Sequence, residues 1–71
     1  MAVTPGVPAG SVEAVLTILR AGPTPIRRRR ILEELERRGR RISLAGLNRI
    51  LDHTVRAGLT LDTPDGVALV R

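Results

Sequence analysis

The sequence contains no cysteine and no phenylalanine, tyrosine or tryptophan among its 71 residues. The absence of cysteine excludes disulfide bridges and thiolate metal sites. Without aromatic side chains, the core has to be built from Leu, Ile, Val and Ala. In a chain of this length, a single core rarely supplies more than about 3–5 kcal/mol of stability. We therefore expect one small domain that a partner or a second copy would stabilise.

Lysine and long apolar runs are absent too. All 12 basic residues are arginine, and no apolar stretch approaches the roughly 18 residues that a membrane-spanning helix needs. Residues 1–10 contain two prolines and two glycines without any periodicity, and they lack the charged start and apolar block of a signal peptide. We interpret residues 1–10 as a flexible leader, assign the domain to residues 11–71 and expect a cytoplasmic location.

The excess positive charge comes from one stretch of the chain. Residues 27–41 contain eight arginines and three acidic residues, which equals the net charge of +5 of the whole sequence. Outside this stretch, four arginines are balanced by four acidic residues. A concentrated basic stripe on a small domain is the electrostatic footprint expected of a protein that binds a nucleic-acid backbone.

Start and stop signals bound two helices in the first half of the chain. The first is predicted over residues 11–21, with Ser11 as its N-cap and Glu13 in its first turn. The second is predicted over residues 25–38, where Thr24 would cap the helix, Pro25 would take the first helical position and Gly39 would end it.

A third helix is predicted over residues 43–57, between the N-cap Ser43 and the stop at Gly58. In all three helices, apolar residues recur at helical spacing and should form the core. These residues are Val12, Val15, Leu16, Leu19, Ile31, Leu32, Leu35, Leu44, Leu47, Ile50, Leu51 and Val55.

The first helix has an apolar arc wider than one face. Ala14 and Ile18 extend it beyond the stripe that a single neighbour would cover. Two interpretations remain open: this flank packs on the C-terminal part of the domain, or it forms a dimer contact.

The end of the sequence changes from a helical period to an alternating one. Leu59, Leu61, Val67 and Leu69 alternate with their neighbours, and residues 63–66 form a turn sequence, Thr-Pro-Asp-Gly. This pattern predicts a C-terminal β-hairpin, and hence a mainly α fold with a small hairpin.

Three helices followed by a hairpin, within residues 11–71, resemble the winged helix-turn-helix superfamily. The stretch ISLAGLNRILDHTVRAGLTLDTPDGVALV looks like the recognition helix and wing of small bacterial or archaeal transcriptional regulators. The resemblance implies a third helix in the major groove and a wing beside the minor groove or the phosphates. Two features depart from the family: the turn after Gly39 is long, and the wing carries Asp62 and Asp65.

The phosphate-binding candidates are Arg27, Arg28, Arg40, Arg41 and Ser43. Arginines at the start of a helix conflict with the positive end of its dipole, and a bound phosphate would remove that conflict. The alternative is a solvated face of ordinary ion pairs four residues apart. Those pairs would be Arg29–Glu33, Arg30–Glu34, Glu33–Arg37 and Glu34–Arg38.

The base-reading candidates are Asn48, Arg49 and Arg56 on the predicted third helix. Arginine favours guanine and asparagine favours adenine, and the small residues Ala45 and Gly46 would permit close approach to a groove. Asp52 would repel phosphates, and we expect it to position one of the two arginines.

No residue set for catalysis or metal binding is evident. His53 is the single histidine, has no ligand company at suitable spacing, and is expected on the surface. We therefore expect no enzyme, no cofactor and no small-molecule site. The preferred hypothesis is a DNA-binding transcriptional regulator with double-stranded DNA as its partner. The alternative is a winged-helix protein-interaction or dimerisation module; RNA binding is disfavoured because aromatic stacking residues are lacking.

Overall fold

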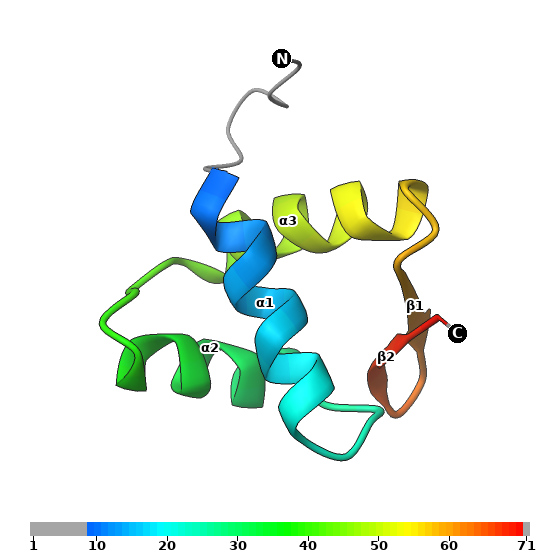
Figure 1. Ribbon diagram of the computed structural model, residues 1–71, viewed down its shortest axis with the longest axis horizontal. Coiled ribbons are helices and arrows are strands. Elements are labelled where there is room, and N and C mark those ends of the chain that lie inside the picture. The colour runs from blue at the N-terminus through cyan, green and yellow to red at the C-terminus, as the bar shows by residue number, and fades with distance from the viewer. Residues whose placement is uncertain (1–8, 71) are drawn as a thin grey trace.

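The computed structural model describes residues 9–70, which form three helices and one antiparallel hairpin (Figure 1). The helices are α1 (Ala9–Ala21), α2 (Arg28–Arg37) and α3 (Leu44–Arg56), and the strands are β1 (Thr60–Thr63) and β2 (Gly66–Leu69). The predicted class, mainly α with a small hairpin, is confirmed at this level. Among the described residues, no helix combines the length and apolar character needed to cross a membrane.

Helix α1 lies across the other two helices and also contacts the hairpin, so every element meets in one core (Figure 1). The core is aliphatic, as the composition requires. Its buried members are Val15, Ile18, Leu19, Ile31, Leu35, Leu47, Ile50, Leu51 and Val67. Ile18 is only 4% exposed and Ala14 packs against this cluster. The apolar flank of α1 is therefore used inside the domain.

The start of α1 was predicted wrongly. The helix begins at Ala9, so Ser11 lies inside its first turn and Glu13 lies beyond that turn. Ser11 is buried and precedes Val15 by one helical turn on the same face. Its side chain therefore belongs to the buried face and does not cap the helix.

The start of α2 was also predicted wrongly. Ile26, at the expected second position of the helix, forms a β-bridge with Val67 instead. Its N–H donates to Val67 O at 2.8 Å and its carbonyl accepts from Val67 N at 2.7 Å. Because both backbone groups are used in this way, the helix can begin only at Arg28. Arg27 is the N-cap and makes no side-chain capping bond.

The stop of α2 and the start of α3 follow local sequence signals. Gly39 ends α2 with a φ of +82°, where glycine is the most favourable residue. Ser43 caps α3, and its Oγ accepts from Gly46 N at 3.0 Å. Gly58, with a φ of +75°, follows the end of α3 as predicted. Leu44 and Val55 were expected in the core but are 51% and 40% exposed.

A buried pair of threonines lies between α3 and the hairpin. Thr54 and Thr60 are 0% and 1% exposed, and their hydroxyl oxygens lie 2.8 Å apart. Thr60 faces inward from β1, which turns Leu59 and Leu61 outward, where they are 41% and 54% exposed. The hairpin was predicted correctly, and in its first strand it is Thr60 that faces the core.

Candidate nucleic-acid interface

The outward face of α3 carries the predicted base-reading residues. Leu47, Ile50, Leu51 and Thr54 turn toward the core, and Ala45, Asn48, Arg49, Asp52 and Arg56 are exposed on other sides of the helix. In the first turn after the Ser43 cap, Ala45 and Gly46 are small, and Leu44 is exposed. The structure therefore presents an accessible helix face that begins at a capped N-terminus.

Two of the three base-reading candidates make no salt bridge within residues 9–70. These are Asn48, which is uncharged, and Arg49. Arg56 is different, because its Nε lies 3.3 Å from Asp52 Oδ2 one turn earlier. Asp52 thus pairs with Arg56, and the side chains of Asn48 and Arg49 remain available to a ligand.

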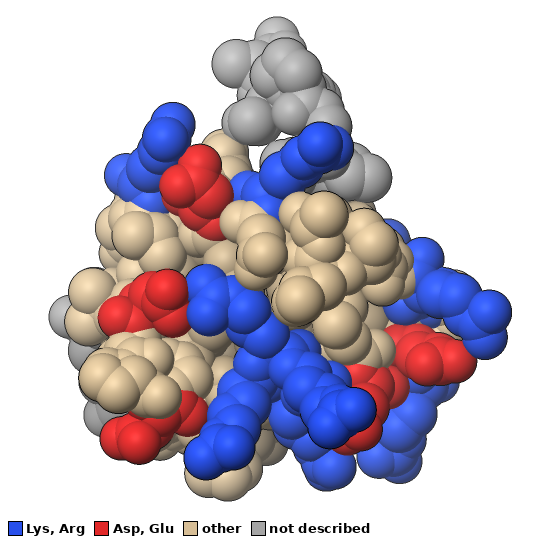
Figure 2. Space-filling view, turned by 180° about the vertical axis from the view of Figure 1, so that it is seen from behind, with Lys and Arg blue, Asp and Glu red and all other residues tan. Residues whose placement is uncertain are grey.

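The basic stretch does not form one uniform surface. Figure 2 shows blue arginine side chains gathered over the middle and lower part of one face, with red acidic side chains on both sides of them. Within α2, Glu34 lies 3.0 Å from Arg37 and 3.6 Å from Arg30. Of the four expected pairs, Arg30–Glu34 is present, and Glu33 is 3.9 Å from Arg30. Local ion pairs therefore offset part of the charge.

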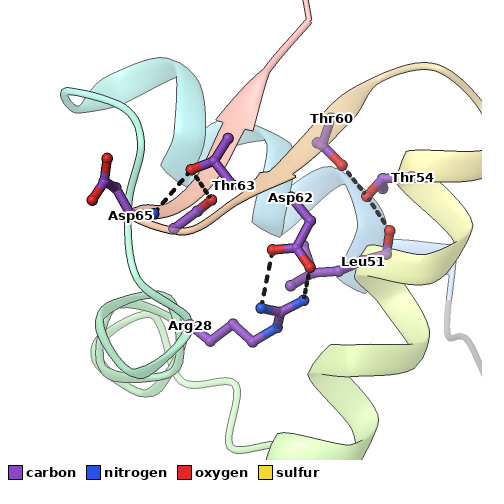
Figure 3. Close-up of polar contacts among 8 residues, drawn as sticks. Arg28, Leu51, Thr54, Thr60, Asp62, Thr63 and Asp65 are labelled. Carbon is purple, nitrogen blue, oxygen red and sulfur yellow. Dashed lines mark hydrogen bonds and ion pairs between the residues drawn. The ribbon is translucent and has the colours of Figure 1, made fainter.

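A bidentate ion pair joins the first residue of α2 to the hairpin. The two terminal nitrogens of Arg28 lie 3.0 and 3.2 Å from the two carboxylate oxygens of Asp62, 34 residues away in the chain (Figure 3). The hydrogen bond from Arg28, reinforced by its charge, lowers the pKa of Asp62 below the ordinary value of 3.8. Sequence reasoning gave Arg28 no partner, because only the fold brings the hairpin to the start of α2.

This ion pair borders a shallow hollow of about 230 Å³ between α2, α3 and the hairpin. Asn48, Leu51, Asp52 and Val55 of α3 form its other side. The Nε atom of Arg28 is buried and has no hydrogen-bond partner in the described part of the chain. The three elements expected to contact DNA therefore meet here, but with two carboxylates beside a single guanidinium.

The remaining phosphate candidates are dispersed. Arg41 pairs with Glu36 at 3.0 Å. The Arg40 guanidinium lies against the first turn of α1, since a Cβ added at Gly10 would be 2.9 Å from its Nη2. Ser43 uses its Oγ as the acceptor in the α3 cap, which leaves its own hydroxyl proton free to be donated.

Arg27 makes no salt bridge within residues 9–70 and lies beside the hairpin tip. The structure thus leaves Arg27 and Arg40 unpaired with an acid in that range, and it pairs Arg28 and Arg41.

His53 is half-buried on α3. Over residues 9–70, the structure contains no group of three or more histidine, cysteine, aspartate or glutamate residues placed to hold a metal ion. Comparison with protein-family models, curated proteins and solved structures gives no match to this chain.

Proposed function

We propose that the domain is a winged helix-turn-helix module that binds double-stranded DNA, with α3 in the major groove, as part of a transcriptional regulator. The observation that carries the proposal is the exposed face of α3, where Asn48 and Arg49 project from a helix that is capped by Ser43 and has the small residues Ala45 and Gly46 in its first turn. Helices of this kind fit the major groove and place such side chains against base edges.

The arginines without acidic partners support a backbone contribution to the same proposal. Within residues 9–70, no acidic side chain pairs with Arg27 or Arg40, so both guanidiniums are available to a ligand. Arg29 is exposed on α2. Phosphate contacts of this type position a protein on DNA, and base contacts specify the sequence. Like the bacterial or archaeal regulators that the chain resembles, the protein would act in the cytoplasm.

A salt-dependent titration tests the backbone part. Labelled duplex DNA is titrated with the parent and with Arg27→Ala plus Arg40→Ala, and anisotropy is measured over a series of salt concentrations. Each lost phosphate contact should reduce the slope of log K against log salt by about 0.9. Arg28→Ala plus Arg41→Ala should change the slope less, because Asp62 and Glu36 already compete for those guanidiniums.

Arg20→Ala is the matched control, since Arg20 is exposed near the end of α1 and makes no salt bridge within residues 9–70. It should leave the slope unchanged. An equal reduction per arginine removed in all three variants would assign the effect to net charge and remove the proposed backbone contacts.

Arg49→Ala tests base reading. At a preferred sequence it should cost about 1–3 kcal/mol, with non-specific affinity nearly intact. Because Arg49 is exposed, its folding stability should stay within about 0.5 kcal/mol of the parent. If Arg49→Ala and Asn48→Ala both bind every duplex as the parent does, α3 does not read DNA.

The alternative, a protein-interaction or dimerisation module, is favoured by one observation. Leu59, Leu61 and Val70 are 41%, 54% and 41% exposed on the outer side of the hairpin. Apolar surface of this kind commonly marks an interaction site. Since Ile18 lies in the core, self-association is better tested with Leu61→Ser and light scattering than on α1. A dimer that Leu61→Ser disperses, without any DNA binding by the parent, would favour this alternative.

A further inference from the structure

A groove of about 430 Å³ lies where the end of α1, the connection to α2 and one flank of α2 meet. Its floor is apolar and includes Ile18, Ala21, Pro23 and Pro25. Ile18 belongs to the core, whereas the other three residues are exposed. The volume falls in the range of about 300–1,000 Å³ that is typical of binding clefts. An open apolar floor of this kind can bind an apolar side chain of a ligand, provided that the charges on the rim of the groove complement those of the ligand.

The rim of the groove is positively charged. Arg30 and Glu34 on one flank of α2 and Arg38 at its C-cap follow one another at four-residue spacing, and the N-cap Arg27 lies at the other end of the helix. Glu34 is compensated by Arg37 at 3.0 Å and by Arg30 at 3.6 Å. Within residues 9–70, neither Arg27 nor Arg38 forms a salt bridge. The groove thus combines an apolar floor with two guanidiniums that have no acidic partner in this range.

This flank of α2 is not the one that meets α3 and the hairpin. Arg28 points to Asp62 of the hairpin, and Arg30 is two residues further on, about 200° around the helix axis. A ligand in the groove would therefore leave the exposed face of α3 uncovered. A nucleic-acid backbone would use the arginines but not the apolar floor, whereas an acidic peptide with large apolar side chains uses both.

We propose that this groove binds an acidic, leucine-containing peptide segment of a partner protein. One apolar side chain lies on the floor, and carboxylates on either side of it pair with Arg27 and Arg38. Such alternation of acidic and apolar residues is common in protein segments that fold only on binding. The inference goes beyond DNA binding and does not depend on it.

The test uses the full chain and the fluorescein-labelled peptide DELLDELLDE, with anisotropy as the readout at an ionic strength of about 0.15 M, where the Debye length is about 8 Å. Arg38→Glu should weaken binding at least about tenfold, because it places a like charge against the peptide. Arg29→Glu makes the same change of charge on another side of α2 and should weaken binding by less than about twofold. Circular dichroism confirms that both variants remain folded.

Two control peptides separate the contributions of the floor and the rim. DESSDESSDE lacks the apolar side chains and NQLLNQLLNQ lacks the carboxylates, so both should bind much more weakly than the parent peptide. Amide chemical shifts of Ala21, Gly22 and Ile26 should move on addition of the parent peptide. Equal losses for Arg38→Glu and Arg29→Glu, full binding of DESSDESSDE, or shifts confined to α3 would each overturn the proposal.

A second copy of the chain is the other occupant that the test can detect. If the protein self-associates and Arg38→Glu disperses it, while DELLDELLDE neither binds nor competes, then the groove is an interface between copies and the peptide proposal is wrong. If the unsubstituted protein is a monomer and binds DELLDELLDE, the proposal is supported, whether or not the protein binds DNA.

Discussion

The buried hydroxyl pair between α3 and β1 gives the sharpest test of how this core is held together. Thr54 Oγ1 donates to Leu51 O at 3.0 Å and lies 2.8 Å from Thr60 Oγ1 (Figure 3). Each threonine has one hydroxyl proton. Because that of Thr54 goes to Leu51 O, Thr60 must be the donor in the contact between the two hydroxyls. Thr54 is therefore the one acceptor assigned to the Thr60 proton.

This asymmetry predicts unequal costs for two similar substitutions. Thr54→Val leaves the Thr60 hydroxyl buried without an acceptor, which should cost about 1–3 kcal/mol. Thr60→Val removes one accepted bond from Thr54 but leaves its bond to Leu51, so it should cost about 0.5–1.5 kcal/mol. The double substitution removes both hydroxyls and keeps the side-chain shapes, and its stability should return close to that of the parent.

Urea unfolding followed by far-ultraviolet circular dichroism measures these free energies, since the chain lacks the aromatic residues that fluorescence requires. A loss at the upper end for Thr54→Val would be a large share of the roughly 3–5 kcal/mol that a core of this size supplies. Thr17→Val is the control: Thr17 Oγ1 donates to Glu13 O at 2.8 Å on the exposed side of α1, and its loss should cost at most about 0.5 kcal/mol. A double variant that loses the sum of the two single costs would refute the coupling.

Two further predictions concern the hairpin. Gly66→Ala should destabilise the fold by more than about 1 kcal/mol, because the residue has a φ of +137° and its Cβ would lie 2.5 Å from Ile26 O. Gly22→Ala is the control and should be tolerated, since the nearest contact of its Cβ would be at 3.9 Å. Thermal unfolding compares the two variants, and equal melting temperatures would contradict the geometry. Asp62 has a lowered pKa in the folded state, so its contribution to stability should be complete above the unfolded value and be lost as pH falls through the folded one. A carboxyl NMR titration should show a higher pKa for Asp62 in Arg28→Gln, and an unchanged value would exclude the ion pair in solution.

Three of the local signals in this sequence were reliable predictors, whereas the cap predicted at Ser11 was wrong. Ser43 as a cap and Gly39 and Gly58 as stops depend on backbone geometry at or next to those residues. The signal at Thr24 and Pro25 failed because Val67, far along the chain, takes both backbone bonds of Ile26. Propensity alone cannot weigh a local cap against a distant strand.

The candidate site was predictable in its residue types but not in its pairings. Asn48 and Arg49 are exposed on α3 as expected. The partner of Arg28, however, is 34 residues away, and it becomes a neighbour only once the hairpin has docked. The inward orientation of Thr60 was not evident for a similar reason, because only the fold brings the buried hydroxyl of Thr54 next to it.

The bridge between Ile26 and Val67 has a consequence for the order in which the chain acquires its structure. A ribosome releases β2 after the three helices, so the segment before α2 has no hydrogen-bonding partner until Val67 has been synthesised. Contacts of such long sequence separation slow folding, because a large loop must be closed before they form. Strand β2 therefore fixes the segment that precedes α2, and a nascent chain that has not yet reached Val67 leaves the backbone of Ile26 without these two hydrogen bonds.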